Sequence, residues 1–322
     1  MKTFLAILCS TSLLYCEPVE EQVPEFITFD QSLILQQPLT PEELQFPEPV
    51  LNLPRQKSPF LAVSLSTLLP GLGNAYLGDF RTASGIFGTF STTVGVGLSV
   101  SDESFQLTNL ITAQNTWAYG IYAAYRDARI YNGQLGYSYK MPTDSLSDLT
   151  TAPFRFSVMK KPEVWGGILG ALACGIGMGY LASPKEARIQ MKLSSEPSFS
   201  PLVALPVGIG EEALFRGFLQ SQLSESLTPW GGIAISSLAF AAVHIPNANA
   251  FEPEDRFRYY TFGLPLIAGI GVYCGHLTQK NHSLKESVAL HTWYDFVIFS
   301  AGALAGRAAI TGRYQFAFST PF

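Results

Sequence analysis

Residues 206–220 read PVGIGEEALFRGFLQ, with three charged side chains inside an otherwise apolar stretch. A charge at the middle of a bilayer costs at least about 2.5 kcal/mol, so three in one span need partners or a purpose. On a helix, Glu212 and Arg216 lie four positions apart and face each other, in a favourable acid-before-base order. Glu211 is then an unpaired acid on the adjacent face. The stretch therefore predicts a membrane helix that carries a functional carboxylate.

The composition of the whole chain agrees with a membrane protein. Of its 322 residues, 47% are hydrophobic and 14% are charged, whereas a soluble domain usually carries about 25% charged residues. The net charge of -5 and the lack of a basic stripe give nucleic acid no binding surface. The cysteines have no CxxC spacing and are interpreted as small apolar residues, not as a disulfide framework or zinc site: Cys9, Cys16, Cys174 and Cys274.

The amino terminus is typical of a targeting segment. Residues 1–16 hold one early lysine and an apolar run that is too short to span a bilayer, which needs roughly 20 residues. The end of this run partly resembles a lipoprotein cleavage box, so lipidation of Cys16, plain cleavage and a retained anchor all stay open. Residues 17–58 are polar, acidic and proline-rich, which favours an extended linker.

The rest of the chain divides by hydropathy. Apolar, glycine-rich runs predict amino-terminal membrane helices within 59–131, and a polar loop follows at 132–161. Residues 162–308 hold about five further apolar segments of helical length, and 309–322 form a tail. The predicted fold class is therefore all-α: a polytopic transmembrane helical bundle with about seven or eight spans, preceded by the signal-like segment and the linker.

Two further polar motifs interrupt the apolar segments of residues 162–308. FAAVH places His244 at the end of an uncharged helix, and HTWYD places His291 and Asp295 four apart on one helix face. Each motif alone also has a purely structural interpretation. His244 could be a hydrogen-bonded core histidine, and Glu212 and Arg216 could be an ion pair that only stabilises their helix. Together with Glu211, these side chains are expected to converge on one wet cavity, because scattered polar groups in lipid would each be costly.

These three motifs carry a family resemblance. EEALFR matches Glu-Glu-x-x-x-Arg, FAAVH matches Phe-x-x-x-His, and HTWYD matches His-x-x-x-Asn/Asp. In this order they resemble the signatures of the CAAX prenyl endopeptidase and bacteriocin-processing (CPBP) family of intramembrane proteases. The resemblance covers about residues 160–306, under half of the chain, and leaves the amino-terminal helices unexplained. Many family members carry asparagine at the position of Asp295.

The resemblance implies an all-helical membrane core and assigns expected roles. Glu211 would be the base that activates water, and Arg216 would hold its neighbour Glu212. His244 and His291 would position that water, bind a metal or stabilise the oxyanion. The expected catalytic residues are Glu211, Glu212, His244, His291 and Asp295. A divalent cation, zinc first, is an alternative to carboxylate-activated water, and its expected ligands are Glu211, His244, His291 and Asp295.

Three functions are compatible with the sequence. The first is an endopeptidase that hydrolyses a peptide or membrane-protein substrate in the bilayer. The second is a catalytically silent scaffold or immunity-type protein of the same fold, since fold does not fix function. The third is a proton-coupled transporter or channel. The signal-like start indicates a bacterial inner (cytoplasmic) membrane, where prenylated CAAX substrates are not expected.

Overall fold

The computed structural model describes residues 55–182, 200–250 and 253–311, all in one compact unit that begins at Arg55. Within these ranges every regular element is a helix, and no strand occurs. The predicted all-helical class is therefore confirmed. The signal-like segment with Cys16, the linker up to residue 54 and the tail from residue 312 lie outside the described residues.

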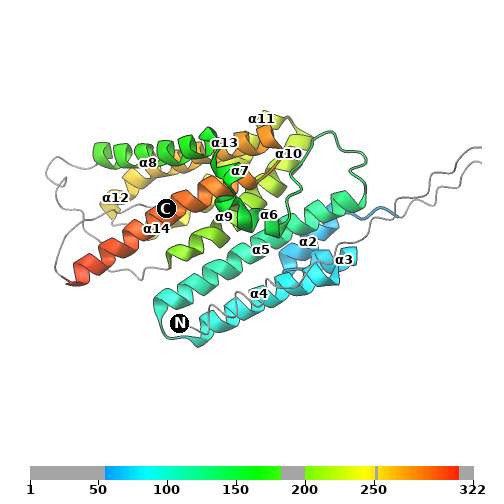
Figure 1. Cartoon of the computed structure of the whole chain (residues 1–322), viewed down its shortest axis with the longest axis horizontal. Helices are drawn as coiled ribbons and strands as arrows, with labels where there is room; N and C mark the ends of the chain where they lie inside the picture. The colour runs from blue at the N-terminus through cyan, green and yellow to red at the C-terminus, as the bar shows by residue number, and fades with distance from the viewer. Residues whose placement is uncertain (1–54, 183–199, 251–252, 312–322) are drawn as a thin grey trace, which may run out of the picture. The chain divides into compact units, whose positions relative to one another are not determined.

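The first described helices form an antiparallel set. Figure 1 shows the two long helices of this set, α4 and α5, running side by side. The chain turns between α2 and α3 at Pro70 and Gly71. Gly71 adopts a left-handed conformation (φ 84°) and is the N-cap of α3. The set consists of α2 (Pro59–Leu68), α3 (Leu72–Leu77), α4 (Phe80–Ser99) and α5 (Glu103–Tyr131).

The segment predicted as a polar loop contains three short helices. A capping box at Ser145 and Asp148 starts the first, because each residue's side chain accepts from the other's backbone N–H. The helices are α6 (Leu146–Thr151), the 3₁₀ turn η2 (Ala152–Phe154) and α7 (Phe156–Met159). The loop is thus a folded element that packs on α14 (Lys285–Thr311).

The following helices carry the three motifs. Two of them are continuous but contain a π-helical segment, namely α9–η4–α10 and α12–η6–α13. In order, the elements are α8 (Pro162–Ala182), η3 (Pro201–Val203), α9 (Ala204–Glu212), η4 (Ala213–Gln220), α10 (Ser221–Ser226), α11 (Pro229–Val243), η5 (Ile245–Ala250), α12 (Pro253–Arg258), η6 (Tyr259–Gly263), α13 (Leu264–Asn281) and α14.

Two helical stretches among the described residues are long and apolar enough to cross a membrane. They cover Pro229–Asn249 and Arg256–Asn281, and a shorter apolar helix covers Pro59–Leu68. A span of the hydrocarbon core needs about 20 mostly apolar residues. The larger expectation of seven or eight spans is not confirmed by this test and stays a prediction.

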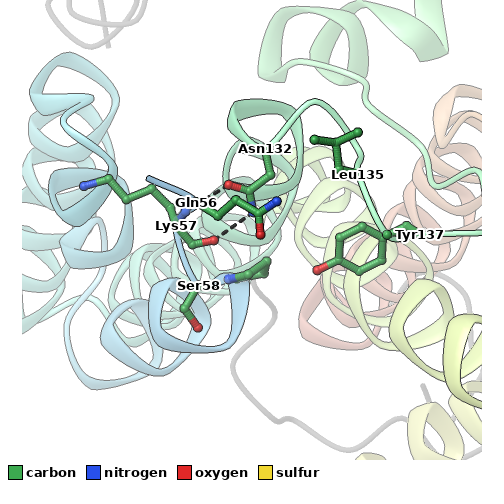
Figure 2. Close-up of a pocket in the computed structure, with 8 residues that line it drawn as sticks. Gln56, Lys57, Ser58, Asn132, Leu135 and Tyr137 are labelled. Atoms are coloured by element: carbon green, nitrogen blue, oxygen red, sulfur yellow. Dashed lines mark hydrogen bonds between the residues drawn. The ribbon is translucent and has the colours of Figure 1, made fainter. Parts of the chain in front are cut away.

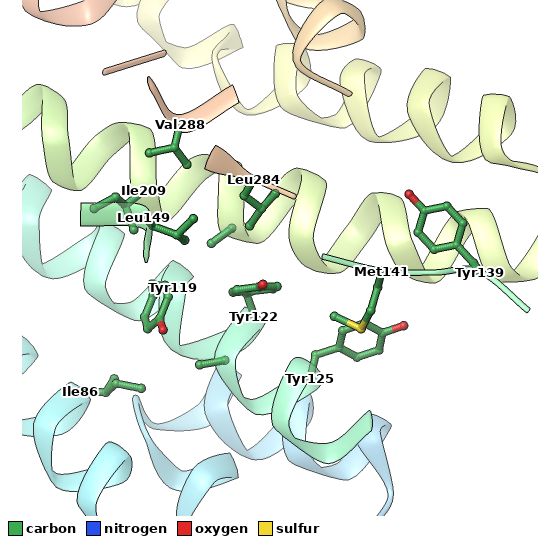
Figure 3. Packing of buried hydrophobic residues seen from close by; sticks show 12 residues of the cluster. Ile86, Tyr119, Tyr122, Tyr125, Tyr139, Met141, Leu149, Ile209, Leu284 and Val288 are labelled. Atoms are coloured by element: carbon green, nitrogen blue, oxygen red, sulfur yellow. The ribbon is translucent and has the colours of Figure 1, made fainter. Parts of the chain in front are cut away.

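The amino-terminal helices share one core with the motif-bearing helices. Tyr122 and Tyr125 of α5 are fully buried, and Ile209 and Ala213 from the α9–η4 stretch belong to the same apolar cluster. Burying a large apolar side chain contributes about 1.5–3 kcal/mol. Figure 3 shows the packing of the cluster, which consists of Ile86, Tyr119, Tyr122, Ala123, Tyr125, Tyr139, Met141, Leu149, Ile209, Ala213, Leu284 and Val288.

Glycines allow α5 to approach this stretch closely. A methyl group at Gly217 would clash with the ring of Tyr122, and one at Gly210 would clash with Asn115. Interiors are packed at crystal-like density, so such a clash cannot be absorbed without moving a helix. Gly210 directly precedes Glu211, so α5 sets the position of the first motif.

We expect Gly217→Ala to destabilise the protein by about 1–3 kcal/mol, because it overpacks the contact with Tyr122. Gly85→Ala in α4 is the matched control, since a methyl group there meets nothing within 4 Å and alanine favours the helix. Thermal unfolding in detergent measures both. Equal melting temperatures for the two variants would show that α5 does not press on this stretch.

Candidate active site

Glu212 joins two helices that are far apart in the sequence. Its side chain is fully buried at the end of α9, and Arg216 Nη1 donates to its Oε1 at 3.1 Å. His291 Nδ1, from α14, donates to the same oxygen at 2.8 Å. The close approach of the helices is possible because Gly208 faces Thr292, where a methyl group would clash. The predicted pair of Glu212 and Arg216 is thus present, with His291 as a third member.

The other ring nitrogen of His291 faces two more carboxylates. Nε2 lies 3.4 Å from Asp295 Oδ2 and 3.7 Å from Glu211 Oε2. Because Nδ1 carries the proton donated to Glu212, Nε2 donates only when the imidazole is protonated. The Glu211 side chain is 22% exposed, while that of Glu212 is 0% exposed. Glu211 is therefore the acid of this motif that water can reach.

His244 approaches the same cluster from α11. It caps that helix, and its Nδ1–H donates to the Phe240 carbonyl at 2.7 Å, which leaves Nε2 as the acceptor nitrogen of the neutral ring. Tyr259 donates its hydroxyl to the His244 carbonyl at 2.7 Å. The Phe240 ring lies 4.8 Å from the His244 ring and 5.9 Å from the His291 ring. His244 also interacts electrostatically with Glu211.

A small cavity borders this cluster. Its volume is about 30 Å³, which is enough for a water molecule. Most of its walls are apolar, so a water there would form its hydrogen bonds with the polar side chains of the lining, those of His291, Tyr294 and Asp295. The lining residues are Phe240, Ile267, Ile270, His291, Tyr294 and Asp295.

A much larger hollow lies elsewhere and is unrelated to the cluster. Figure 2 shows this open space of about 510 Å³ beside the start of α2 and the end of α5. Lys57 and Asn132 bond each other across its wall, from Lys57 N to Asn132 Oδ1 at 2.9 Å and from Asn132 Nδ2 to Lys57 O at 2.8 Å. The Lys57 ammonium donates to the Tyr76 carbonyl. None of the predicted site residues lines this hollow.

The predicted metal ligands do not form a closed metal site. Among the described residues, no three His, Cys, Asp or Glu side chains are grouped so that they could hold a metal ion. His291 donates Nδ1 to Glu212 and has Glu211 and Asp295 at ion-pair distances from Nε2. The zinc hypothesis therefore stays a prediction.

Asp144, which the sequence did not indicate, fixes the start of α14. Its carboxylate accepts from the Leu284 N–H at 2.7 Å and the Ser283 hydroxyl at 3.1 Å, and it pairs with Lys285 at 3.1 Å. Its carbonyl accepts from Arg126 of α5 at 2.7 Å. A carboxylate at a helix amino terminus satisfies unpaired N–H groups and opposes the helix dipole. Asp144 therefore ties α5 to the helix that carries His291 and Asp295.

The fold and the site together define a helical, membrane-associated protein with a buried carboxylate–histidine cluster. A family model described as type II CAAX prenyl endopeptidase Rce1-like matches residues 194–297. The matched segment contains all three motifs and confirms the resemblance to this family of membrane-embedded proteases. It covers less than half of the chain, and α2 to α8 lie outside it. No curated protein and no solved structure matches the chain.

We expect Glu212→Gln and Glu211→Gln to differ in stability. Removing the Glu212 charge leaves Arg216 buried without its counter-ion, and breaking a buried pair in this way costs about 3–5 kcal/mol. Glu211 is partly exposed and lies 3.7 Å from His291 Nε2, so its substitution should cost far less. Thermal unfolding of both variants tests this, and equal losses would contradict the assigned roles.

We expect Asp144→Ala to loosen the first turns of α14, because the helix loses its bonds at Leu284 and Ser283, at about 1–3 kcal/mol. Hydrogen exchange followed by mass spectrometry would show faster exchange around residues 284–292. Asp79→Ala is the matched control, since Asp79 caps α4 through Thr82. The faster exchange caused by Asp79→Ala should stay within α4. If Asp144→Ala leaves the exchange of α14 unchanged, Asp144 does not hold the start of that helix.

Proposed function

We propose that the protein is an intramembrane endopeptidase in which Glu211 activates the water that attacks the peptide bond. The observation that supports this most is the position of Glu211, 3.7 Å from His291, which together with Asp295 lines a cavity of water size. General-base catalysis requires a carboxylate within hydrogen-bond reach of its water, in a site largely closed to bulk solvent.

The proposed reaction has two proton transfers. Glu211 takes a proton from water, and the resulting hydroxide attacks the scissile carbonyl carbon. His244 or His291, with its imidazole protonated, then stabilises the tetrahedral oxyanion by donating a hydrogen bond from Nε2. The carbon–nitrogen bond breaks, and Glu211 returns the proton to the leaving amine. Glu212 acts through His291, because it accepts the Nδ1 proton and so orients the ring.

A catalytically silent scaffold of the same fold is the main alternative. In such a scaffold, the buried network of Glu212, Arg216 and His291 would only hold the helices together. A scaffold does not explain why Glu211, one residue earlier, points a partly exposed carboxylate at His291. A proton-coupled transporter would need ionisable residues along a path across the bilayer, and those named above gather in one cluster.

The proposal extends to location and substrate. A bacterial inner membrane, with seven or eight spans, agrees with the signal-like start and the apolar runs. The substrate would be a peptide or membrane protein that enters the site from the bilayer. Unprenylated membrane peptides are therefore the first substrates to try, and prenylated CAAX peptides, after which the matched family model is named, are the comparison.

Hydrolysis in ¹⁸O-labelled water tests the proposal directly. The full chain in vesicles is incubated with farnesylated CAAX peptides and with a pool of unprenylated membrane peptides, and new carboxyl termini are sought by mass spectrometry. Wild-type protein should produce termini that carry one ¹⁸O atom. We expect Glu211→Gln to lose at least 100-fold in rate, the lower range for a general base.

The controls separate the alternatives. Gln222→Glu, on the exposed face of α10, keeps the site intact and should retain full activity. If wild-type and Glu211→Gln protein release the same termini at the same rate, the endopeptidase proposal is wrong. Treatment with chelator, with metal content measured before and after, tests zinc: loss of both metal and activity would restore the metal-dependent mechanism.

A further inference from the structure

An aromatic segment, defined as residues 153–165, presents large apolar rings outward from the loop between α5 and α8. Phe154 is 67% exposed, Phe156 is 80% exposed and Trp165 is 47% exposed. The first two rings lie within the polar loop of residues 132–161, and the third follows it. Without a partner that covers them, they would face water. Contiguous apolar surface of this kind marks a binding surface.

The backbone beneath these rings is held in place. Trp165 donates its indole N–H to the Met159 carbonyl at 2.7 Å, and Val158 is buried in the core with α8 and α14. Trp293 of α14 donates to the Pro153 carbonyl at 2.9 Å. The outward rings therefore sit on a fixed scaffold and cannot fold back onto the protein by a simple loop movement.

The apolar surface continues from the segment along α8. Trp165, Leu169 and Ile176 are spaced along one side of this helix, and Leu169 and Ile176 are 62% and 63% exposed. A helix that presents this much aliphatic surface in a membrane protein faces lipid tails. Phe156 lies just before the helix begins, so it belongs at the level where lipid tails meet headgroups, the usual place of aromatic anchors.

The charged side chains of the aromatic segment also suit contact with lipid headgroups. Lys160 is exposed, and Arg155 is 42% exposed although it pairs with Asp148 at 3.1 Å. Lys161 and Glu163 are engaged on the protein side, with Glu286 and Lys280. The outward charges are thus Lys160 and the Arg155–Asp148 pair, and the cation of Lys160 beside the rings suits the phosphates of an anionic leaflet.

We propose that residues 153–165 form an in-plane anchor that binds the headgroup region of an anionic bilayer, with Phe154 and Phe156 at the acyl boundary. The anchor bears on the cluster described above, because the Phe154 ring contacts that of Trp293 (centroids 6.3 Å apart), which lies between His291 and Asp295 in α14. The anchor thereby fixes the depth of that cluster near one membrane surface.

Site-directed spin labelling measures the depth of the anchor without any assay of catalysis. Phe156→Cys is labelled with a nitroxide in full-length protein whose four native cysteines are replaced, in vesicles of three parts phosphatidylcholine to one part phosphatidylglycerol. We expect oxygen, which collects in lipid, to relax this label several-fold more than a water-soluble nickel complex. The matched control is Lys140→Cys, exposed in the same loop, where the nickel complex should dominate.

Two results would overturn the anchor. A label at 156 that the nickel complex reaches as well as it reaches 140 would place the rings in water. A label that neither reagent reaches would mean that protein, such as a second copy of the chain, covers them. A separate comparison tests the preference for anionic lipid. The label should lie shallower in vesicles without phosphatidylglycerol, and Lys160→Gln should reduce the difference in depth between the two kinds of vesicle. A failed peptidase assay would leave these results unaffected.

Discussion

The structure depends on one buried carboxylate that accepts hydrogen bonds from two side chains. Glu212 is completely removed from solvent and accepts hydrogen bonds from both Arg216 and His291 through the same oxygen. Desolvation of two charges costs several kcal/mol per ion, and only close, well-directed partners offset it. If the helix of Glu212 separated from the helix of His291, the Glu212 carboxylate would keep Arg216 but lose its hydrogen bond to His291. The polar cluster is thus the constraint that sets how α9 and α14 pack.

Glycine makes this packing possible on both sides of the Glu212 helix. Gly208 lets α14 approach at Thr292, and Gly210 and Gly217 let α5 approach on another side. The first motif is therefore held between a helix inside the matched family segment and a helix outside it. The amino-terminal helices, whose role the sequence left open, form part of the wall behind the site. Asp144 adds a second link between the same two sides.

The spacing of residues in the sequence correctly predicted the contacts that form within a single helix. The pairing of Glu212 with Arg216 and the shared face of His291 and Asp295 follow from a separation of four residues, and both are present. The contact between Glu212 and His291 joins residues 79 apart, so no periodicity could reveal it. Asp144 was missed for the same reason, since its partners lie about 140 residues away. The helices of the loop after α5 were missed because each is under two turns long.

The two π-helical segments lie close to two of the three motifs. An α-helix advances 100° per residue, so the one extra residue in a π turn rotates everything beyond it by about that angle. The segment η4 follows Glu212 directly; Glu211 and Glu212 before it approach His291 of α14, and Gly217 within it meets α5. The segment η6 carries Tyr259, whose hydroxyl holds the His244 carbonyl. The irregular turns therefore lie where one helix must satisfy both a polar site and its apolar neighbours.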